Sequence, residues 1–462
     1  MKKISLLIAV LLTAAILAPA TMAQENRALW SLSTYVQSAK IQYAHVYKKK
    51  GKLRSDLYMS IDLMREASGR YPRVPEVYNM LGSFFAEIRA VDTMIAYFDS
   101  VEITCADQSI PAEYRKNCYK VDDNFIEVIN GIRQKFWEES YNDGVEYLRQ
   151  YDTIRVMKAN APTDDSAKVI EALREKAINM CLHSFEMAKK LKPKDPLAYN
   201  GMGILLEREK KHPEAIDQFK EAMRLKGEDS VSVSRIAYAY IEIPDWKNAI
   251  IWFERLLDYT PKNTSVMINL SIAYSQLNEY DKAQEYNEKV LAVESTNAQA
   301  LFNAGQYWFM KMQEAAVAIS DVPDSAKDAE ARRKELDAQA LDARTKAEGY
   351  FERIIANNPN DKDALKRLGI LYLLSQQNEK AAEAFAKHMA VDSTDASVLD
   401  YLGRAYIQMG KFQEAIRPYE ILISTDPGNA EGWERLEELY RYTNQPEKAD
   451  QAKKTAEDLR KM

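Results

Sequence analysis

Histidine and cysteine are the residues of this 462-residue chain that most often carry catalysis or bind metal ions. Cys181 and His183 lie close enough to suggest a nucleophile with its base, but side chains two positions apart on a helix face different ways. Cys181 is therefore expected to be an inert core thiol. The four histidines are dispersed, and none has a partner at metal-site spacing: His45, His183, His212 and His388.

No local motif supplies chemistry either. The sequence contains no Gly-rich phosphate loop, no G-x-S-x-G and no H-E-x-x-H. The paired acids Asp164 and Asp165 are most simply explained as helix-capping residues. The sequence predicts a protein that is not an enzyme and that has no catalytic residue, no cofactor and no metal site.

Cys105 and Cys118 flank a loop and are expected to form a disulfide in an oxidising compartment. Closing a loop of this length would stabilise the fold by roughly 3 kcal/mol on the chain-entropy model. Two free thiols are the alternative. The spacing fits neither a zinc site nor a haem attachment site.

Residues 1–23 have the pattern of a secretory signal peptide. Lys2 and Lys3 precede an apolar run over 4–18, and Thr21, Met22 and Ala23 offer small residues before a cut. We expect an exported protein, in the periplasm of a bacterial cell envelope, with no integral membrane span after cleavage. An uncleaved membrane anchor is the alternative.

Charge and composition limit the classes of partner. The 63 basic and 69 acidic residues give a formal net charge of −6 over a large surface. That mild imbalance argues against nucleic acid as the main partner. The sparse Gly and Pro content favours an all-helical chain.

One pattern of small and aromatic residues recurs every thirty-four residues. Its clearest copy contains Tyr199, Gly203, Leu206, Ala215, Phe219 and Ala222, and the next contains Val233, Ala237, Tyr240, Ala249, Phe253 and Leu256. The period and the residue types resemble the tetratricopeptide repeat (TPR) family, whose units are pairs of helices. Gly203 is expected to face Ala215 where the two helices cross.

The resemblance implies an all-α fold, a right-handed superhelical α-solenoid built of helical hairpins. The expected organisation is a signal peptide (1–23), an N-terminal helical region with degenerate repeats (24–120), a divergent repeat with an insertion (121–195), and a TPR array (196–462) with an insertion at 313–346.

Two units are interrupted. The spacing from the Gly to the small residue is twelve in regular copies, but it is thirty-seven from Gly144 to Cys181 and forty-two from Gly305 to Ala347. About twenty-five and thirty residues are therefore inserted. Helix-forming residues flank a short turn in both inserts, which predicts extended helical hairpins; disordered charged loops are the alternative.

The resemblance also implies a binding surface, because the first helices of such arrays line a concave face. Carried over by offset, an apolar groove for a peptide or an amphipathic helix is predicted, with neighbouring elements covering these residues as the alternative. The partner would be an unknown protein. A structural or assembly factor that acts through its hairpins or through homo-oligomerisation is the second hypothesis. The groove residues are Tyr238, Ile241, Ile272, Phe302, Phe309, Met310, Ile370, Leu373 and Arg404.

Overall fold

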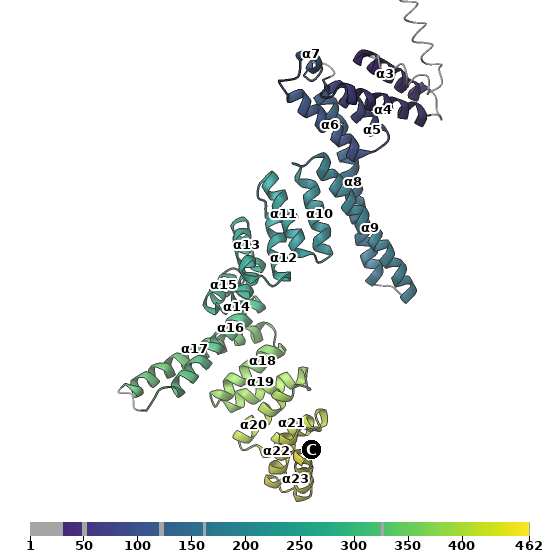
Figure 1. The fold of residues 1–462 in the computed structure, drawn as a ribbon. Coiled ribbons are helices and arrows are strands. Elements are labelled where there is room, and N and C mark those ends of the chain that lie inside the picture. The colour runs from purple at the N-terminus through teal and green to yellow at the C-terminus, as the bar shows by residue number, and fades with distance from the viewer. Residues whose placement is uncertain (1–30, 49–52, 120–123, 160–162, 325–327, 462) are drawn as a thin grey trace, which may run out of the picture. The chain divides into compact units, whose positions relative to one another are not determined.

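The computed structural model describes residues 31–461 except 49–52, 120–123, 160–162 and 325–327. The expected signal peptide lies outside the described residues. Every regular element in the described part of the chain is a helix, as predicted (Figure 1). The helices form two compact units, 1–227 and 228–462, which are described separately.

The first unit begins with two helical hairpins, and a short helix follows them. It continues with one long hairpin and one regular hairpin. Its helices are α3 (Leu32–Lys48), α4 (Leu53–Arg70), α5 (Pro75–Glu87), α6 (Val91–Ala106), α7 (Ala112–Arg115), α8 (Phe125–Ala159), α9 (Asp164–Leu191), α10 (Pro196–Arg208) and α11 (His212–Lys226).

The second unit stacks six hairpins, each packed on the next. We call the members of a hairpin its first and second helix. The helices are α12 (Ser230–Glu242), α13 (Trp246–Tyr259), α14 (Thr264–Gln276), α15 (Tyr280–Val293), α16 (Ala298–Ser320), α17 (Ala329–Asn357), α18 (Lys362–Leu374), α19 (Asn378–Val391), α20 (Ala396–Gln408), α21 (Phe412–Thr425), α22 (Ala430–Tyr442) and α23 (Pro446–Lys461).

A repeated capping residue explains where the first helices begin. From α10 onward, each first helix follows an Asp or Asn whose side chain accepts a hydrogen bond from a backbone N–H in the first turn. Such a cap satisfies donors that the helix itself cannot pair, and it stabilises a helix by about 1 kcal/mol. The caps are Asp195, Asp229, Asn263, Asn297, Asp361, Asp395 and Asn429.

A glycine of the first helix lets an aromatic ring of the second helix pack against the backbone. A Cβ built on Gly203 would lie 2.6 Å from the ring of Phe219, and one on Gly369 would lie 2.5 Å from the ring of Phe385. The nearest neighbour of Gly203 is thus the ring of Phe219, a contact that the sequence did not predict. The ring requires the glycine, because a Cβ at this position would overlap the ring.

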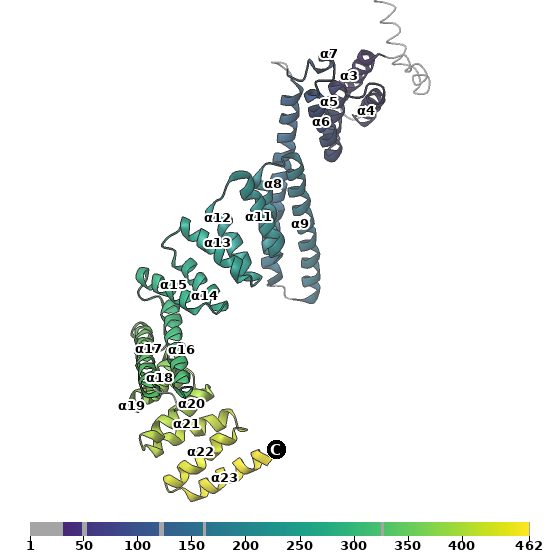
Figure 2. The ribbon, with the colours of Figure 1, turned by 60° about the vertical axis from the view of Figure 1, so that its left-hand side comes forward.

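Both inserts are helical hairpins, as predicted, and each extends a repeat without altering its base (Figures 1 and 2). α16 has 23 residues where α14 has 13, and α17 has 29 where α15 has 14. The longer helices add roughly 15 and 22 Å of length, at about 1.5 Å per residue. At the base, Gly305 still meets the ring of Phe351, and Gly144 meets that of Phe185.

Candidate functional site

The predicted groove residues all belong to first helices of the second unit. Most are partly buried, while Tyr238 on α12 is 44% exposed and Arg404 on α20 is exposed. We call this set the first-helix face: Tyr238 and Ile241 on α12, Ile272 on α14, Phe302, Phe309 and Met310 on α16, Ile370 and Leu373 on α18, and Arg404 on α20.

Contacts with α14 and with α13 fix the orientation of Tyr238. Its hydroxyl accepts a hydrogen bond from Asn269 Nδ2 of α14 at 3.3 Å. Its ring lies edge-on against Phe253, with 5.2 Å between the ring centroids. The ring is therefore held in place and still presents much of its area to solvent, which suits an aromatic contact residue.

The two phenylalanines of α16 differ. Phe302 is partly buried and packs edge-on against Phe351 of α17 at 5.7 Å. Phe309 is 7% exposed, and the guanidinium carbon of Arg367 lies over its ring at 5.5 Å. Phe309 thus contributes to the hydrophobic core and presents little surface to a partner.

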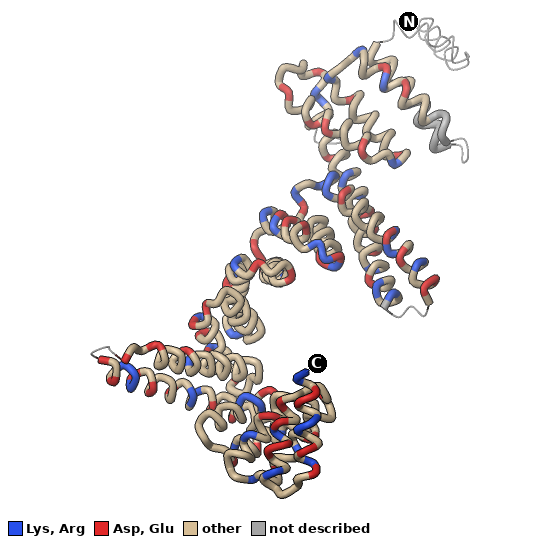
Figure 3. The backbone as a smooth tube through the Cα atoms, turned by 60° about the horizontal axis from the view of Figure 1, so that its bottom comes forward, with Lys and Arg blue, Asp and Glu red and all other residues tan. Residues whose placement is uncertain are grey.

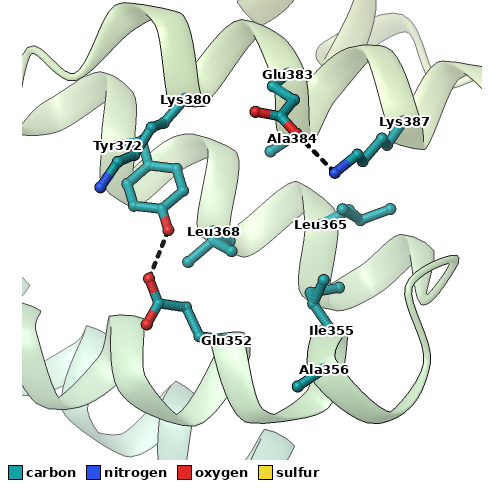
Figure 4. A pocket seen from close by; sticks show the side chains of 10 residues that line it. All are labelled: Glu352, Ile355, Ala356, Leu365, Leu368, Tyr372, Lys380, Glu383, Ala384 and Lys387. Atoms are coloured by element: carbon teal, nitrogen blue, oxygen red, sulfur yellow. Dashed lines mark hydrogen bonds and ion pairs between the residues drawn. The ribbon is translucent and has the colours of Figure 1, made fainter.

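A pocket of about 410 Å³ is lined by residues of α17, α18 and α19 (Figure 4). Its floor is apolar, with Leu365 and Leu368 buried beneath charged side chains. The Tyr372 hydroxyl donates to Glu352 Oε1 at 2.7 Å, and Lys380 Nζ lies 5.2 Å from the centre of the Tyr372 ring. The pocket was not predicted from the sequence.

The Glu–Tyr–Lys arrangement of this pocket occurs three times in the second unit. The tyrosine of a first helix donates at 2.7–2.8 Å to a glutamate of the preceding second helix, and a lysine of the following helix lies over its ring at 5.2 Å. Because the arrangement recurs where α13 meets α14, α17 meets α18 and α21 meets α22, we interpret it as an inter-repeat contact. The sets are Glu254, Tyr274 and Lys282; Glu352, Tyr372 and Lys380; Glu420, Tyr440 and Lys448.

Burial and the neighbouring carboxylate change the acidity of these tyrosines. Burial, followed by the hydrogen bond to Glu352, raises the pKa of Tyr372 above its ordinary value. Tyr274 and Tyr440 have raised pKa values for the same reasons. Each hydroxyl therefore stays protonated and remains a hydrogen-bond donor at neutral pH.

The residues that first suggested chemistry are not arranged for it. Cys181 is fully buried, its Sγ lies 3.4 Å from the Gly144 carbonyl oxygen, and burial raises the pKa of its thiol to about 12. Such a thiol is not a nucleophile at neutral pH. Within the described residues, no group of three or more His, Cys, Asp or Glu side chains is placed to hold a metal ion.

Cys105 and Cys118 are joined by a disulfide, with their Cα atoms 5.7 Å apart. The bond links the end of α6 to the segment that follows α7.

Among the helices that the structure describes, none is both long and apolar enough to cross a membrane. Acidic and basic residues are interspersed along the α16–α17 hairpin (Figure 3).

Comparisons with known proteins identify the repeats. Residues 264–294, 336–395 and 398–431 each match a family described as tetratricopeptide repeat. A curated relative, the general transcriptional corepressor trfA of Dictyostelium discoideum, is 29% identical over 83 residues. That match covers 18% of this chain and spans only 6% of the relative's length.

Two solved structures share part of the architecture at low identity. A MamA protein is 17% identical with a TM-score of 0.34, and it covers 43% of this chain and 92% of its own. YrrB, described as a TPR protein with an unusual peptide-binding site, is 18% identical with a TM-score of 0.35, covering 45% of this chain and 91% of its own. The matched residues and the stacked helical hairpins together show that this chain contains tetratricopeptide repeats within an all-helical array.

Proposed function

We propose that this protein, as a non-catalytic scaffold for protein–protein interaction, binds a peptide or an amphipathic helix on the first-helix face of its second unit. The observation that carries this proposal is the apolar character of that face. A tyrosine with 44% of its surface exposed lies among isoleucine and leucine side chains that are only partly buried. Accessible apolar surface of this kind is typical of partner sites.

We place this function in the bacterial cell envelope. The pattern of residues 1–23 supports export. The Cys105–Cys118 disulfide also supports it, because disulfides persist in oxidising compartments and are rare in the cytosol.

Cross-linking in the native envelope, followed by identification of the captured proteins, tests the proposal. We expect Tyr238→Ser combined with Ile272→Ser to lower capture at least tenfold. Ile251→Ser on the second helix α13 is the matched control, since Ile251 is 51% exposed and lies outside the first-helix face. Equal capture by the double variant and the control would contradict the groove.

A second candidate, a structural or assembly factor that acts through its hairpins, rests on exposed apolar side chains there. Val317 on α16 is 60% exposed and Leu341 on α17 is 53% exposed. Deleting residues 314–343 removes both and restores the regular spacing of twelve between Gly305 and Ala347. Loss of capture or of self-association in this variant, with its helical content retained, would favour the hairpin over the first-helix face.

A further inference from the structure

One position of the second helices is apolar and buried in every repeat except one. It lies seven residues after the position that is Ala in most of the repeats. The exception is His388 on α19, which is 1% exposed. The equivalent residues are Val101, Ala188, Ala222, Leu256, Val290, Ile354, Leu422 and Ala456, all of them buried.

Few polar groups interact with the buried imidazole of His388. Its Nδ1 has no hydrogen-bond partner, and its Nε2 lies 3.8 Å from Asp395 Oδ2, which is beyond hydrogen-bond distance. Asp395 is already engaged, because it caps α20 and accepts a hydrogen bond from Lys366 Nζ of α18 at 2.8 Å.

The positive and negative side chains around the imidazole are equal in number. Asp392 ends α19 and forms an ion pair with Lys362 of α18 at 3.1 Å. Two lysines and two aspartates therefore face His388, and both carboxylates are paired with lysine. A proton added to the imidazole would create a buried cation that lacks a free carboxylate, which is costly.

We propose that His388 makes the contact between α19 and α20 acid-sensitive, so that protonation of its imidazole opens this contact and loosens the last two repeats, α20 to α23. This regulatory role goes beyond the proposed binding function and does not depend on it.

The direction of the effect follows from proton linkage. Burial is the main cause that lowers the pKa of His388 below 6.5; the two lysines act in the same sense, and Asp395 and Asp392 oppose it. Below pH 6.5 the opened form binds a proton that the packed form excludes. The equilibrium constant for opening therefore rises up to tenfold per pH unit, from pH 6.5 down to the pKa of the packed state, and it is unchanged above pH 7.

Hydrogen exchange of the full-length protein between pH 7.5 and 5.0, corrected for intrinsic exchange rates, tests the proposal. His388 is the only histidine of the second unit in the sequence, so amides of α12 to α15 serve as an internal reference. We expect protection in α19 to α21 to fall threefold to tenfold per pH unit below pH 6.5, while the reference amides change much less.

Two variants separate the imidazole from general acid effects. His388→Leu restores the apolar residue of the other repeats and should remove the pH dependence. His388→Gln keeps a neutral polar side chain and should be less protected at every pH, but equally independent of pH. The proposal is overturned if His388→Leu retains the wild-type pH dependence, or if NMR shows that the imidazole of the folded protein titrates at or above pH 6.5.

Discussion

The two helices of a repeat cross closely in both α14–α15 and α18–α19, but different residues meet at the two crossings. In α18–α19, Gly369 leaves room for the buried ring of Phe385. In α14–α15, the same two positions hold Ser271 and Asn287, and the Ser271 hydroxyl donates to Asn287 Oδ1 at 2.7 Å. Both residues are at most 2% exposed. Helices can thus cross through steric fit or through a buried hydrogen bond, and the two solutions should respond differently to substitution.

The crossing between Gly369 and Phe385 should lose the most stability on substitution. Gly369→Leu places a side chain where even a Cβ would lie 2.5 Å from the Phe385 ring. We expect the free energy of unfolding to fall by at least about 3 kcal/mol, because overpacking forces both helices apart. Urea unfolding measures the loss. Gly349→Leu is the control, since its Cβ would meet no atom within 4 Å; similar losses in both variants would contradict the steric explanation.

The crossing between Ser271 and Asn287 should lose less stability on substitution. It should also be possible to replace this pair with glycine and phenylalanine. Asn287→Ala leaves the buried Ser271 hydroxyl without its acceptor, which should lower the free energy of unfolding by about 2 kcal/mol. Ser271→Gly combined with Asn287→Phe recreates the pair found in α18–α19 and should recover most of that loss. Thermal and urea unfolding compare the variants. A double variant that is less stable than Asn287→Ala would show that the two solutions are not interchangeable.

Removing the hydroxyl of an inter-repeat tyrosine should lower stability by a smaller amount, and by the same amount in both repeats. Tyr372→Phe removes the hydrogen bond to Glu352, and Tyr274→Phe removes the one to Glu254. Each should lower the free energy of unfolding by about 1 kcal/mol. Tyr442, which is 71% exposed, is the control, and Tyr442→Phe should change stability very little. Unequal losses at Tyr274 and Tyr372 would indicate that the repeats differ in more than their helix crossings.

Substitutions in the turns should have effects no larger than those of the tyrosine variants. Gln376 has φ 59° in the turn between α18 and α19, where Gly410 has φ 70° in the turn between α20 and α21. Side chains in this left-handed region cost about 1 kcal/mol relative to glycine. We expect Gln376→Gly to raise stability by about 0.5 kcal/mol and Gly410→Ala to lower it by about 1 kcal/mol in thermal unfolding. Stabilisation by Gly410→Ala would refute this account.

The repeat frame was predictable because its offsets are fixed in the sequence. The spacing from Gly369 to Phe385 is sixteen, and the structure brings Gly305 against Phe351 across forty-six residues. The extra thirty residues are those expected from the neighbouring Gly-to-Ala spacing. The Cys105–Cys118 bond was also predicted correctly.

The site was predictable only in outline. Offsets place Phe309 on the first-helix face, but they do not reveal that Arg367 lies over its ring. The Glu352–Tyr372 contact joins helices of successive repeats, and neither residue is unusual by itself in the sequence. His388 is visible in the sequence as an exception, because a histidine replaces the apolar residue found at that offset in the other repeats.

The two long hairpins also bear on how such a protein can be modified. Each adds helix length beyond a Gly–Phe contact of the kind found in the uninterrupted repeats, so a repeat keeps this contact when its helices are extended. The turns after α14 and α18 occupy the equivalent place in shorter repeats. These turns should accept a reporter domain or an epitope, provided that the two chain ends of the guest lie as close together as the ends of the helices it joins.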